Sequence, residues 1–155
     1  MFPSNSPKAI GEDFEYVVES FFRQRDIPIF DTPETHDFGV DLILYLQGKC
    51  IAIQCKDHRS PVGIDAVQAV TSGVAYYDAD MGAVVCTGGF TASAKKLAAA
   101  NGVILIDGST LQKVFNEDDV DASYFQQLLG ISECPKAENP IVKRRFWDIF
   151  RPRKA

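Results

Sequence analysis

The sequence predicts an α/β sandwich in which helices flank a central mixed β-sheet. Segments with apolar residues at helical spacing alternate with short apolar runs of strand length, in the order helix, three strands, helix, strand, helix, strand, helix. Two adjacent strand-like segments, 39–46 and 49–56, are separated only by Gln47-Gly48, a linker typical of a β-hairpin. Because a hairpin makes its two strands antiparallel, a purely parallel sheet is excluded.

Four helices are predicted before residue 116. The first spans 8–25, where Ser6-Pro7 provides a cap and apolar residues recur at helical spacing: Ile10, Phe14, Val17, Val18, Phe21 and Phe22. The second spans 64–77 and contains small residues that permit close packing, namely Ala66, Ala69, Ser72 and Gly73. A third helix follows the capping Thr91 and runs to about Ala100, and a short fourth ends near Phe115.

Three strands outside the hairpin complete the predicted sheet. Residues 27–30 form a short edge strand, a position that tolerates Pro28. Residues 83–87 and 103–106 are continuous apolar runs of the kind buried on both faces. The hairpin and the two buried runs therefore form the centre of the sheet.

Length and composition indicate one globular domain. The chain has 155 residues, of which 46% are hydrophobic. We expect a core domain at 8–115, a short appended helix packed on it within 116–134, and a linker with a C-terminal tail at 135–155. No apolar run approaches the roughly 20 residues of a membrane span, and the first residues do not resemble a signal peptide, so a cytoplasmic location is expected. The four cysteines show no CxxC spacing, which disfavours disulfide and zinc sites.

Charge is divided unevenly along the chain. The formal net charge is −5, yet residues 141–155 carry six Lys or Arg and one Asp, a net of +5, which leaves −10 on residues 1–140. An acidic body argues against simple phosphate binding. Contact with nucleic acid would need a local basic patch, a metal ion or the basic tail.

One end of the hairpin gathers three polar side chains. With a two-residue turn, Leu46 faces Lys49, Asp41 lies opposite Gln54, and Lys56 follows on the same face. The other face is apolar and reads Val40, Leu42, Leu44, Leu46, Ile51, Ile53 and Cys55. An acid and a lysine within reach of one point suit divalent-metal and phosphate chemistry.

A set of short motifs appears in order along the chain and resembles a known family. The motifs are Gly11-Glu12-Asp13-Phe14-Glu15, Asp37-Phe38-Gly39-Val40-Asp41, Gln54-Cys55-Lys56, Val62-Gly63 with Gln68, Val84-Val85-Cys86-Thr87 with Phe90-Thr91-Ala94, and Leu105-Ile106-Asp107-Gly108. Between about Gly11 and Leu111 they resemble the Mrr-type restriction endonuclease domain, a branch of the PD-(D/E)xK nuclease superfamily. The resemblance implies a restriction-endonuclease-like sandwich and a metal-dependent phosphodiesterase.

The resemblance also implies roles for four residues. Asp41 corresponds to a metal ligand, Gln54 stands in place of the second acid, and Lys56 corresponds to the catalytic lysine. Glu15 corresponds to the first-helix acid that points into the site, although its spacing from Glu12 and Glu19 also suits a solvated helix face.

The implied cofactor is Mg²⁺, for which Mn²⁺ is expected to substitute. Magnesium keeps several waters and takes one or two protein carboxylates, so Asp41, the Gln54 side-chain oxygen and the Cys55 backbone carbonyl would form a partial shell. Lys56 would lie near the attacking water or a non-bridging oxygen. Because Gln54 is neutral, metal affinity should be weak unless Glu15 contributes, directly or through water.

Other candidate substrate contacts are less specific. Gln68 lies at the edge of the apolar stripe of its helix, where packing is an equal explanation. His58 is a loop histidine without a partner cluster, and Thr87 could simply cap a loop. In the tail, Lys143, Arg144 and Arg145 are candidate phosphate contacts.

The tail admits three readings. Residues 143–151 mix basic and aromatic side chains, as expected of a DNA-contacting arm, a membrane-surface helix, or a helix that docks into a partner protein or a second copy. A membrane is not the expected partner. Docking is favoured over the DNA-contacting arm, because the large apolar side chains exceed what phosphate contact needs: Phe146, Trp147, Ile149 and Phe150.

The sequence thus predicts a metal-dependent endonuclease that hydrolyses DNA phosphodiester bonds, with restriction or defence against foreign or modified DNA as the role that the resemblance suggests. The competing hypothesis is a non-catalytic module that uses the nuclease fold to bind nucleic acid or a partner protein. An RNA-processing nuclease of the same superfamily is a third hypothesis.

Overall fold

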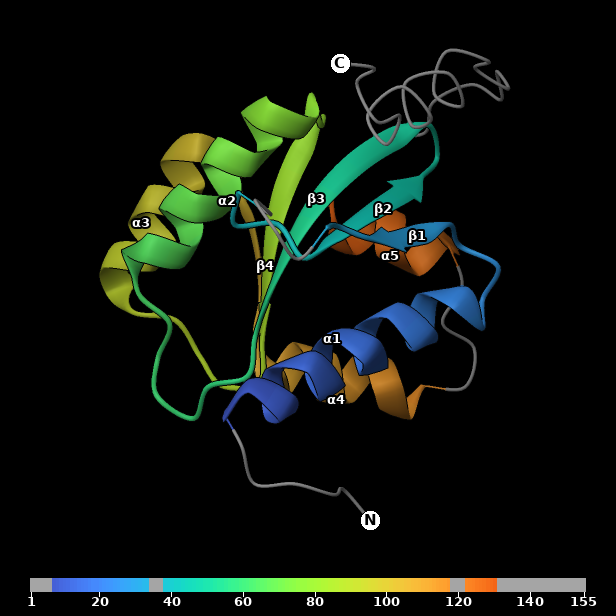
Figure 1. Ribbon diagram of the computed structural model, residues 1–155, viewed down its shortest axis with the longest axis horizontal. Coiled ribbons are helices and arrows are strands. Elements are labelled where there is room, and N and C mark those ends of the chain that lie inside the picture. Colours follow the sequence, from blue (N-terminus) through green and yellow to red (C-terminus); the bar gives the residue numbers. More distant parts are fainter. Residues whose placement is uncertain (1–6, 34–37, 118–121, 131–155) are drawn as a thin grey trace.

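The computed structural model describes residues 7–33, 38–117 and 122–130, and they form a mixed five-stranded sheet covered by helices on both faces (Figure 1). The strands are β1 (Ile29–Asp31), β2 (Leu42–Leu46), β3 (Lys49–Lys56), β4 (Met81–Cys86) and β5 (Ile104–Ile106). They lie in sequence order across the sheet, antiparallel from β1 to β3 and parallel from β3 to β5. The predicted α/β sandwich with a mixed sheet is confirmed.

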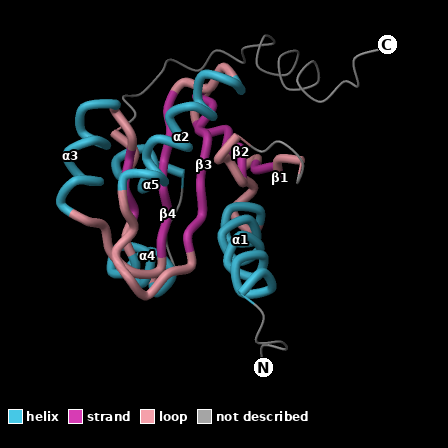
Figure 2. The backbone as a smooth tube through the Cα atoms, turned by 60° about the vertical axis from the view of Figure 1, so that its left-hand side comes forward, coloured by secondary structure: helices cyan, strands magenta, loops and turns pink. Residues whose placement is uncertain are grey.

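Five helices enclose this sheet in two layers. They are α1 (Pro7–Arg23), α2 (Ile64–Tyr77), α3 (Ala92–Asn101), α4 (Gly108–Asn116) and α5 (Ala122–Leu128). Figures 1 and 2 show α2 and α3 on one side of the sheet and α1, α4 and α5 on the other. Each layer has its own apolar cluster, one around Leu44 and Ile51 under α1, and one around Val67 and Val84 under α2. Among the described residues, no helix combines the length and apolar character needed to cross a membrane.

Helix ends follow local backbone chemistry. The first helix ends at Arg23, two residues before the predicted end, because Asp26 takes a positive φ of 56° and the Ile27 N–H donates to the Phe22 carbonyl at 3.1 Å. At α3 the predicted cap is present, since the Thr91 side chain accepts from the Ala94 N–H. At α4 the Asp107 carboxylate accepts from the Thr110 N–H, which lowers the pKa of Asp107.

The hairpin has the predicted register as far as Leu42. Leu46 pairs with Lys49 and Leu42 with Ile53, and both turn residues, Gln47 and Gly48, have positive φ, as a tight two-residue turn requires. Beyond this point the strict pairing stops, because the Asp41 N–H donates to the Ile53 carbonyl at 2.8 Å. Two residues of one strand thus adjoin one residue of the other, the arrangement of a β-bulge.

The bulge corrects two sequence-based assignments. Asp41 was predicted directly opposite Gln54, yet its N–H donates to the Ile53 carbonyl. Val40 was predicted on the same face as Leu42 and Leu44, yet it is buried in the cluster under α2, whereas Leu42 belongs to the cluster under α1. A two-residue period cannot continue through a bulge, since the extra residue shifts the alternation.

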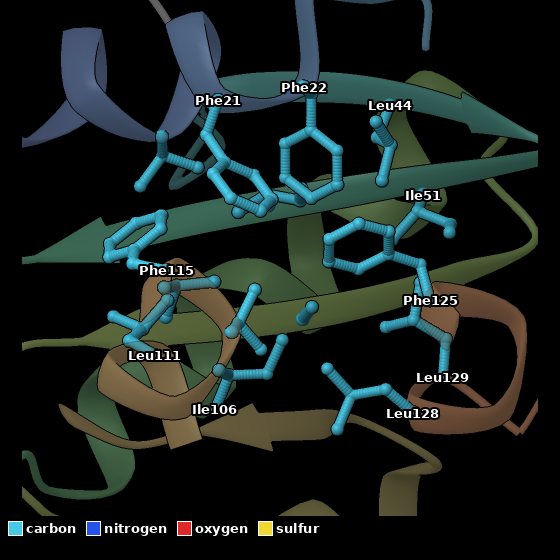
Figure 3. A pocket seen from close by; sticks show the side chains of 15 residues that line it. Phe21, Phe22, Leu44, Ile51, Ile106, Leu111, Phe115, Phe125, Leu128 and Leu129 are labelled. Carbon is cyan, nitrogen blue, oxygen red and sulfur yellow. The ribbon is translucent and has the colours of Figure 1, made fainter. Parts of the chain in front are cut away.

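A small apolar cavity of about 30 Å³ lies between the sheet and α1, α4 and α5 (Figure 3). Its walls are aromatic and aliphatic side chains, including Phe21, Phe22, Ile51, Phe115 and Phe125. A dry apolar void of this size is a packing imperfection, because it offers no polar partner to water.

Candidate active site

The candidate catalytic residues meet where the start of β2 adjoins the end of β3. Asp41 directly precedes β2, and Gln54 and Lys56 lie in the last three residues of β3. Since β2 and β3 are antiparallel, these two strand ends are neighbours. Gln54 is buried, whereas Asp41 and Lys56 are half-buried and keep part of their surface toward solvent.

Asp41 is held by backbone hydrogen bonds on two sides. Its carboxylate Oδ2 accepts from the Cys55 N–H at 2.7 Å. Its own carbonyl accepts from the Thr32 N–H at 3.0 Å, and its N–H donates to Ile53. The carboxylate is therefore fixed against the end of β3 instead of turning freely at a strand terminus, and a charged acceptor makes that bond a strong one.

The segment before Asp41 is shaped by close contact with α2. Gly39 has a φ of +72°, and a Cβ atom there would lie 2.5 Å from the Ala69 side chain. A Cβ at Gly73 would overlap the Val40 side chain and lie 2.9 Å from the Phe38 carbonyl oxygen. Two glycines, one on each partner, thus let residues 38–40 lie directly on the helix. Because Asp41 follows at once, α2 sets the approach of the carboxylate to β3.

Gln54 connects β3, α2 and Lys56. With its amide oriented to satisfy both neighbours, its nitrogen donates to the Ala66 carbonyl at 2.9 Å and its oxygen accepts from Lys56 Nζ at 3.3 Å. Only 7% of Gln54 is exposed, so these partners replace water. The ammonium of Lys56 is thereby steered to the same strand end as the Asp41 carboxylate.

Cys55 lies near the end of β3, directly before Lys56, and its side chain is buried. Burial raises the pKa of the Cys55 thiol well above its ordinary value, and the negative charges of Asp41 and Glu15 raise it further, whereas Lys56 lowers it. The thiol therefore stays protonated near neutral pH and serves neither as a nucleophile nor as a thiolate ligand. Glu15 itself is half-buried on α1.

This donor set fits magnesium better than zinc. Within residues 7–33, 38–117 and 122–130, no three His, Cys, Asp or Glu side chains are grouped as metal ligands. Magnesium needs fewer protein ligands, since it keeps several waters and binds through one or two carboxylates. Among the candidate oxygen donors, the Asp41 carboxylate is fixed at the end of β3 by the Cys55 N–H, whereas the Gln54 amide oxygen faces the Lys56 ammonium.

Glu19, one turn after Glu15, is not on a solvated face. It is 7% exposed and forms an ion pair with Arg23. Burial raises its pKa, the charge of Asp31 on β1 raises it further, and Arg23 partly offsets both. The alternative interpretation of Glu12, Glu15 and Glu19 as a common wet face is therefore wrong at Glu19.

Two predicted substrate contacts lie together in the loops that follow β3 and β4. Thr87 Oγ1 donates to Asp57 Oδ1 at 2.8 Å and contacts the His58 carbonyl at 3.4 Å. A Cβ at Gly88 would lie 2.5 Å from that same carbonyl, so the loops pack tightly. Thr87 thus ties the loops together, and His58 is exposed beside it.

The remaining predicted contacts are not joined to this cluster. Gln68 is exposed on α2, and Lys143, Arg144 and Arg145 lie outside the described residues. Sequence reasoning missed Asp57, Ala66 and the role of Gly73. The sequence contained a signal for Asp57, since this residue directly follows Lys56. No sequence signal indicated a role for the backbone carbonyl of Ala66.

Comparison with known proteins identifies the family. The restriction endonuclease model Mrr_cat matches residues 8–115. No match was found among curated proteins.

The chain is similar to solved structures at low identity, and two of them share its fold. AF1548, a protein of unknown function, is 12% identical with a TM-score of 0.53, and the match covers 87% of this chain and 76% of that one. The DNA modification-dependent restriction endonuclease AspBHI is 19% identical with a TM-score of 0.57, covering 76% of this chain and 34% of that one. The MspJI restriction endonuclease, in complex with a 27-mer oligonucleotide, is 19% identical with a TM-score of 0.44. The match covers 83% of this chain and 34% of that one. This chain spans about a third of the length of the two named endonucleases.

The family match and the geometry concern the same residues. The matched segment is more than half of the chain and contains α1, the hairpin, α2 and the two parallel strands. It includes Glu15, Asp41, Gln54 and Lys56. The chain therefore belongs to the restriction endonuclease family that Mrr_cat describes.

Proposed function

We propose that this chain is a metal-dependent endonuclease that hydrolyses DNA phosphodiester bonds, with Asp41, Gln54, Lys56 and Glu15 as its site. The observation that carries the proposal is the joint placement of a fixed carboxylate and an oriented ammonium. Asp41 is bonded to the Cys55 N–H, and Lys56 Nζ lies 3.3 Å from the Gln54 amide oxygen. Family membership supplies the substrate class.

Each residue has a role that its position supports. Asp41 and Glu15, with the Cys55 carbonyl, would hold Mg²⁺ or Mn²⁺, and a divalent ion of this kind supplies charge neutralisation and an acidified water. Lys56 would stabilise negative charge on a non-bridging phosphate oxygen or orient the attacking water. Gln54 keeps the Lys56 ammonium directed to this point, and its oxygen is a further candidate ligand. Cleavage of foreign or modified DNA is the proposed biological use.

The proposal is tested with purified full-length protein on supercoiled, linear and branched DNA, with magnesium or manganese against EDTA. We expect nicking or cutting that requires the metal. Asp41→Asn and Lys56→Ala should each reduce the rate by at least about 100-fold, the scale of losing one electrostatic group from an active site. Asp41→Asn keeps an oxygen for the Cys55 N–H, so it tests the charge and not the bond.

Lys113→Ala provides the matched control, because Lys113 is an exposed lysine on α4. It should cut DNA like the wild type. If the Asp41 and Lys56 variants fold and retain wild-type activity, the assigned site is wrong. Metal-independent DNA binding without any cleavage would instead favour the non-catalytic module.

A further inference from the structure

Two aromatic rings stack on each other at the surface beside the candidate site. The ring centroids of Phe38 and Tyr76 are 3.8 Å apart and the ring planes are 23° from parallel. Phe38 is 42% exposed and Tyr76 is 58% exposed. Tyr77, which is buried, contacts Tyr76 edge-on at 5.0 Å and anchors it to the core. A stacked pair that stays this exposed contributes less burial than the same rings would inside the core.

The position of the Phe38 ring is set by the backbone. Phe38 has a φ of +49°, which is uncommon for a bulky residue. Its carbonyl oxygen approaches Gly73 on α2, and the following Gly39 contacts Ala69. The same close packing that fixes the approach of Asp41 therefore fixes the ring. Sparsely populated backbone conformations persist where the surrounding structure holds them, and they gather at functional sites.

The stack is close to the candidate scissile position. Phe38 and Asp41 are three residues apart, so their Cα atoms are separated by at most about 10 Å. Nucleotides follow each other at roughly 3.4 Å along one strand of B-form DNA. The rings are thus within a few nucleotides of a phosphate held at Asp41.

The surroundings favour an uncharged, planar occupant. Asp78 and Asp80, both exposed, follow Tyr76 at the end of α2 and would repel a phosphate. Other large exposed apolar side chains lie elsewhere: Tyr16 and Val17 on α1, Phe115 on α4, and Ile64 at the opposite end of α2. Two rings alone are too small a patch for a stable protein interface. A nucleobase offers a flat neutral face of matching size, and base–aromatic stacking is tolerant of sequence.

We propose that the Phe38–Tyr76 stack is a platform for an unpaired or unstacked nucleobase a few nucleotides from the phosphate that is cut. This inference rests on the proposed DNA nuclease function and narrows its substrate. The protein then prefers DNA with a bulged, mismatched or single-stranded base near the cleavage point to a perfect duplex of the same sequence.

The test measures binding of the full-length wild type by fluorescence anisotropy at one fixed salt concentration, in EDTA and in Ca²⁺. The ligands are a perfect duplex, the same duplex with one bulged base, and the single strand. We expect the bulged DNA to bind about 10-fold more tightly than the duplex, within the range of one base–aromatic stack. With 2-aminopurine as the bulged base, its fluorescence should be quenched on binding.

Four variants locate the effect. Phe38→Leu and Tyr76→Leu keep an apolar side chain over α2 but remove the π-face, so the preference for bulged DNA should disappear while duplex affinity stays unchanged. Tyr16→Leu, which alters an exposed tyrosine on α1, is the matched control and should keep the preference. Tyr76→Phe retains a ring, so it should also keep the preference for bulged DNA. This variant provides a second test if either leucine variant fails to fold.

The outcomes separate the two proposals. Equal affinity of the wild type for paired and bulged DNA, or absence of quenching, overturns the platform while metal-dependent cleavage of duplex would leave the nuclease function standing. Retention of the preference in both leucine variants also overturns it. If the wild type neither binds nor cuts any of the DNAs, both proposals fall.

Discussion

At the scale of the residue, Gln54 distinguishes this site most clearly. A neutral amide can donate and accept, and the structure uses both abilities, toward the Ala66 carbonyl and the Lys56 ammonium. A carboxylate in the same place could accept only. The substitution that adds a metal-binding charge therefore also removes a hydrogen bond to α2.

This double effect gives a prediction for Gln54→Glu. Without metal, the variant should be less stable by about 1–3 kcal/mol, because a buried carboxylate oxygen then faces the Ala66 carbonyl. If position 54 coordinates the ion, magnesium should raise its melting temperature more than that of the wild type, and a lower magnesium concentration should give half-maximal cleavage. Thermal unfolding with and without magnesium measures this effect. An equal magnesium shift in both proteins would show that position 54 is no ligand.

Glu19 gives a prediction about pH. Its pKa is raised in the folded protein, first by burial and then by Asp31. Folding then favours the protonated carboxyl, so this group supports stability at low pH, and that support is lost as the pH rises from the unfolded to the folded pKa. Glu19→Gln removes the titration. Its unfolding free energy relative to the wild type should rise between pH 4 and pH 7.

Urea unfolding across this pH range measures the effect. Glu117→Gln, at an exposed position after α4, is the control for the same substitution at the surface. If the unfolding free energies of Glu19→Gln and the wild type depend on pH in the same way, Arg23 fully compensates the buried charge of Glu19.

Strand register was predicted where the residue pattern decides it and was missed where the backbone departs from that pattern. The two-residue turn predicted Asp41, Gln54 and Lys56 at one strand end. In the structure, Asp41 accepts from the Cys55 N–H and Gln54 from Lys56, but Asp41 adjoins Ile53 and not Gln54. The bulge at Asp41 and the burial of Glu19 were not predictable, because both depend on contacts with segments distant in sequence. The catalytic roles themselves stay predictions until the variants are measured.

At the scale of the element, α2 supports the site as much as it covers the sheet. Its small residues were expected to permit close packing, and the structure shows what packs there, namely residues 38–40 at Ala69 and Gly73. Helix and strand periodicity predicted the order of elements, whereas their ends shifted by one to three residues, most at the start of β2. Those ends depend on single backbone events, such as the positive φ of Asp26, that periodicity does not encode.

The close contact at Gly73 predicts that replacing this helical glycine by alanine lowers stability, the opposite of the usual effect. In an exposed helix interior, glycine to alanine stabilises by roughly 0.5–1 kcal/mol. Here the added Cβ would overlap Val40 and approach the Phe38 carbonyl, so Gly73→Ala should destabilise by about 1–3 kcal/mol and lower the cleavage rate by displacing Asp41. Ser72→Ala, at the exposed neighbour, is the control for helix propensity. Chemical denaturation measures the change in stability, and a DNA cleavage assay measures the rate. A Gly73→Ala variant that is more stable than the wild type and fully active would show that α2 does not position Asp41.

At the scale of the whole molecule, the described residues contain the sheet, both helical layers and the candidate site. The family match ends at residue 115. The basic aromatic tail therefore lies outside both the described residues and the matched segment, and its role is inferred from its sequence pattern.

The last prediction is that the tail is an attachment device separate from catalysis. It follows from the charge of +5 on residues 141–155 against −10 on the rest, and from Pro135 and Pro140, which interrupt the pattern of the core. Truncation after Asn139 should leave the melting temperature and metal-dependent cleavage rate near normal while weakening self-association, partner binding or DNA affinity. Salt separates these options, because phosphate contacts weaken steeply as salt rises, whereas burial of Phe146, Trp147, Ile149 and Phe150 does not. A truncated protein that unfolds would place the tail within the core and make this division of the chain wrong.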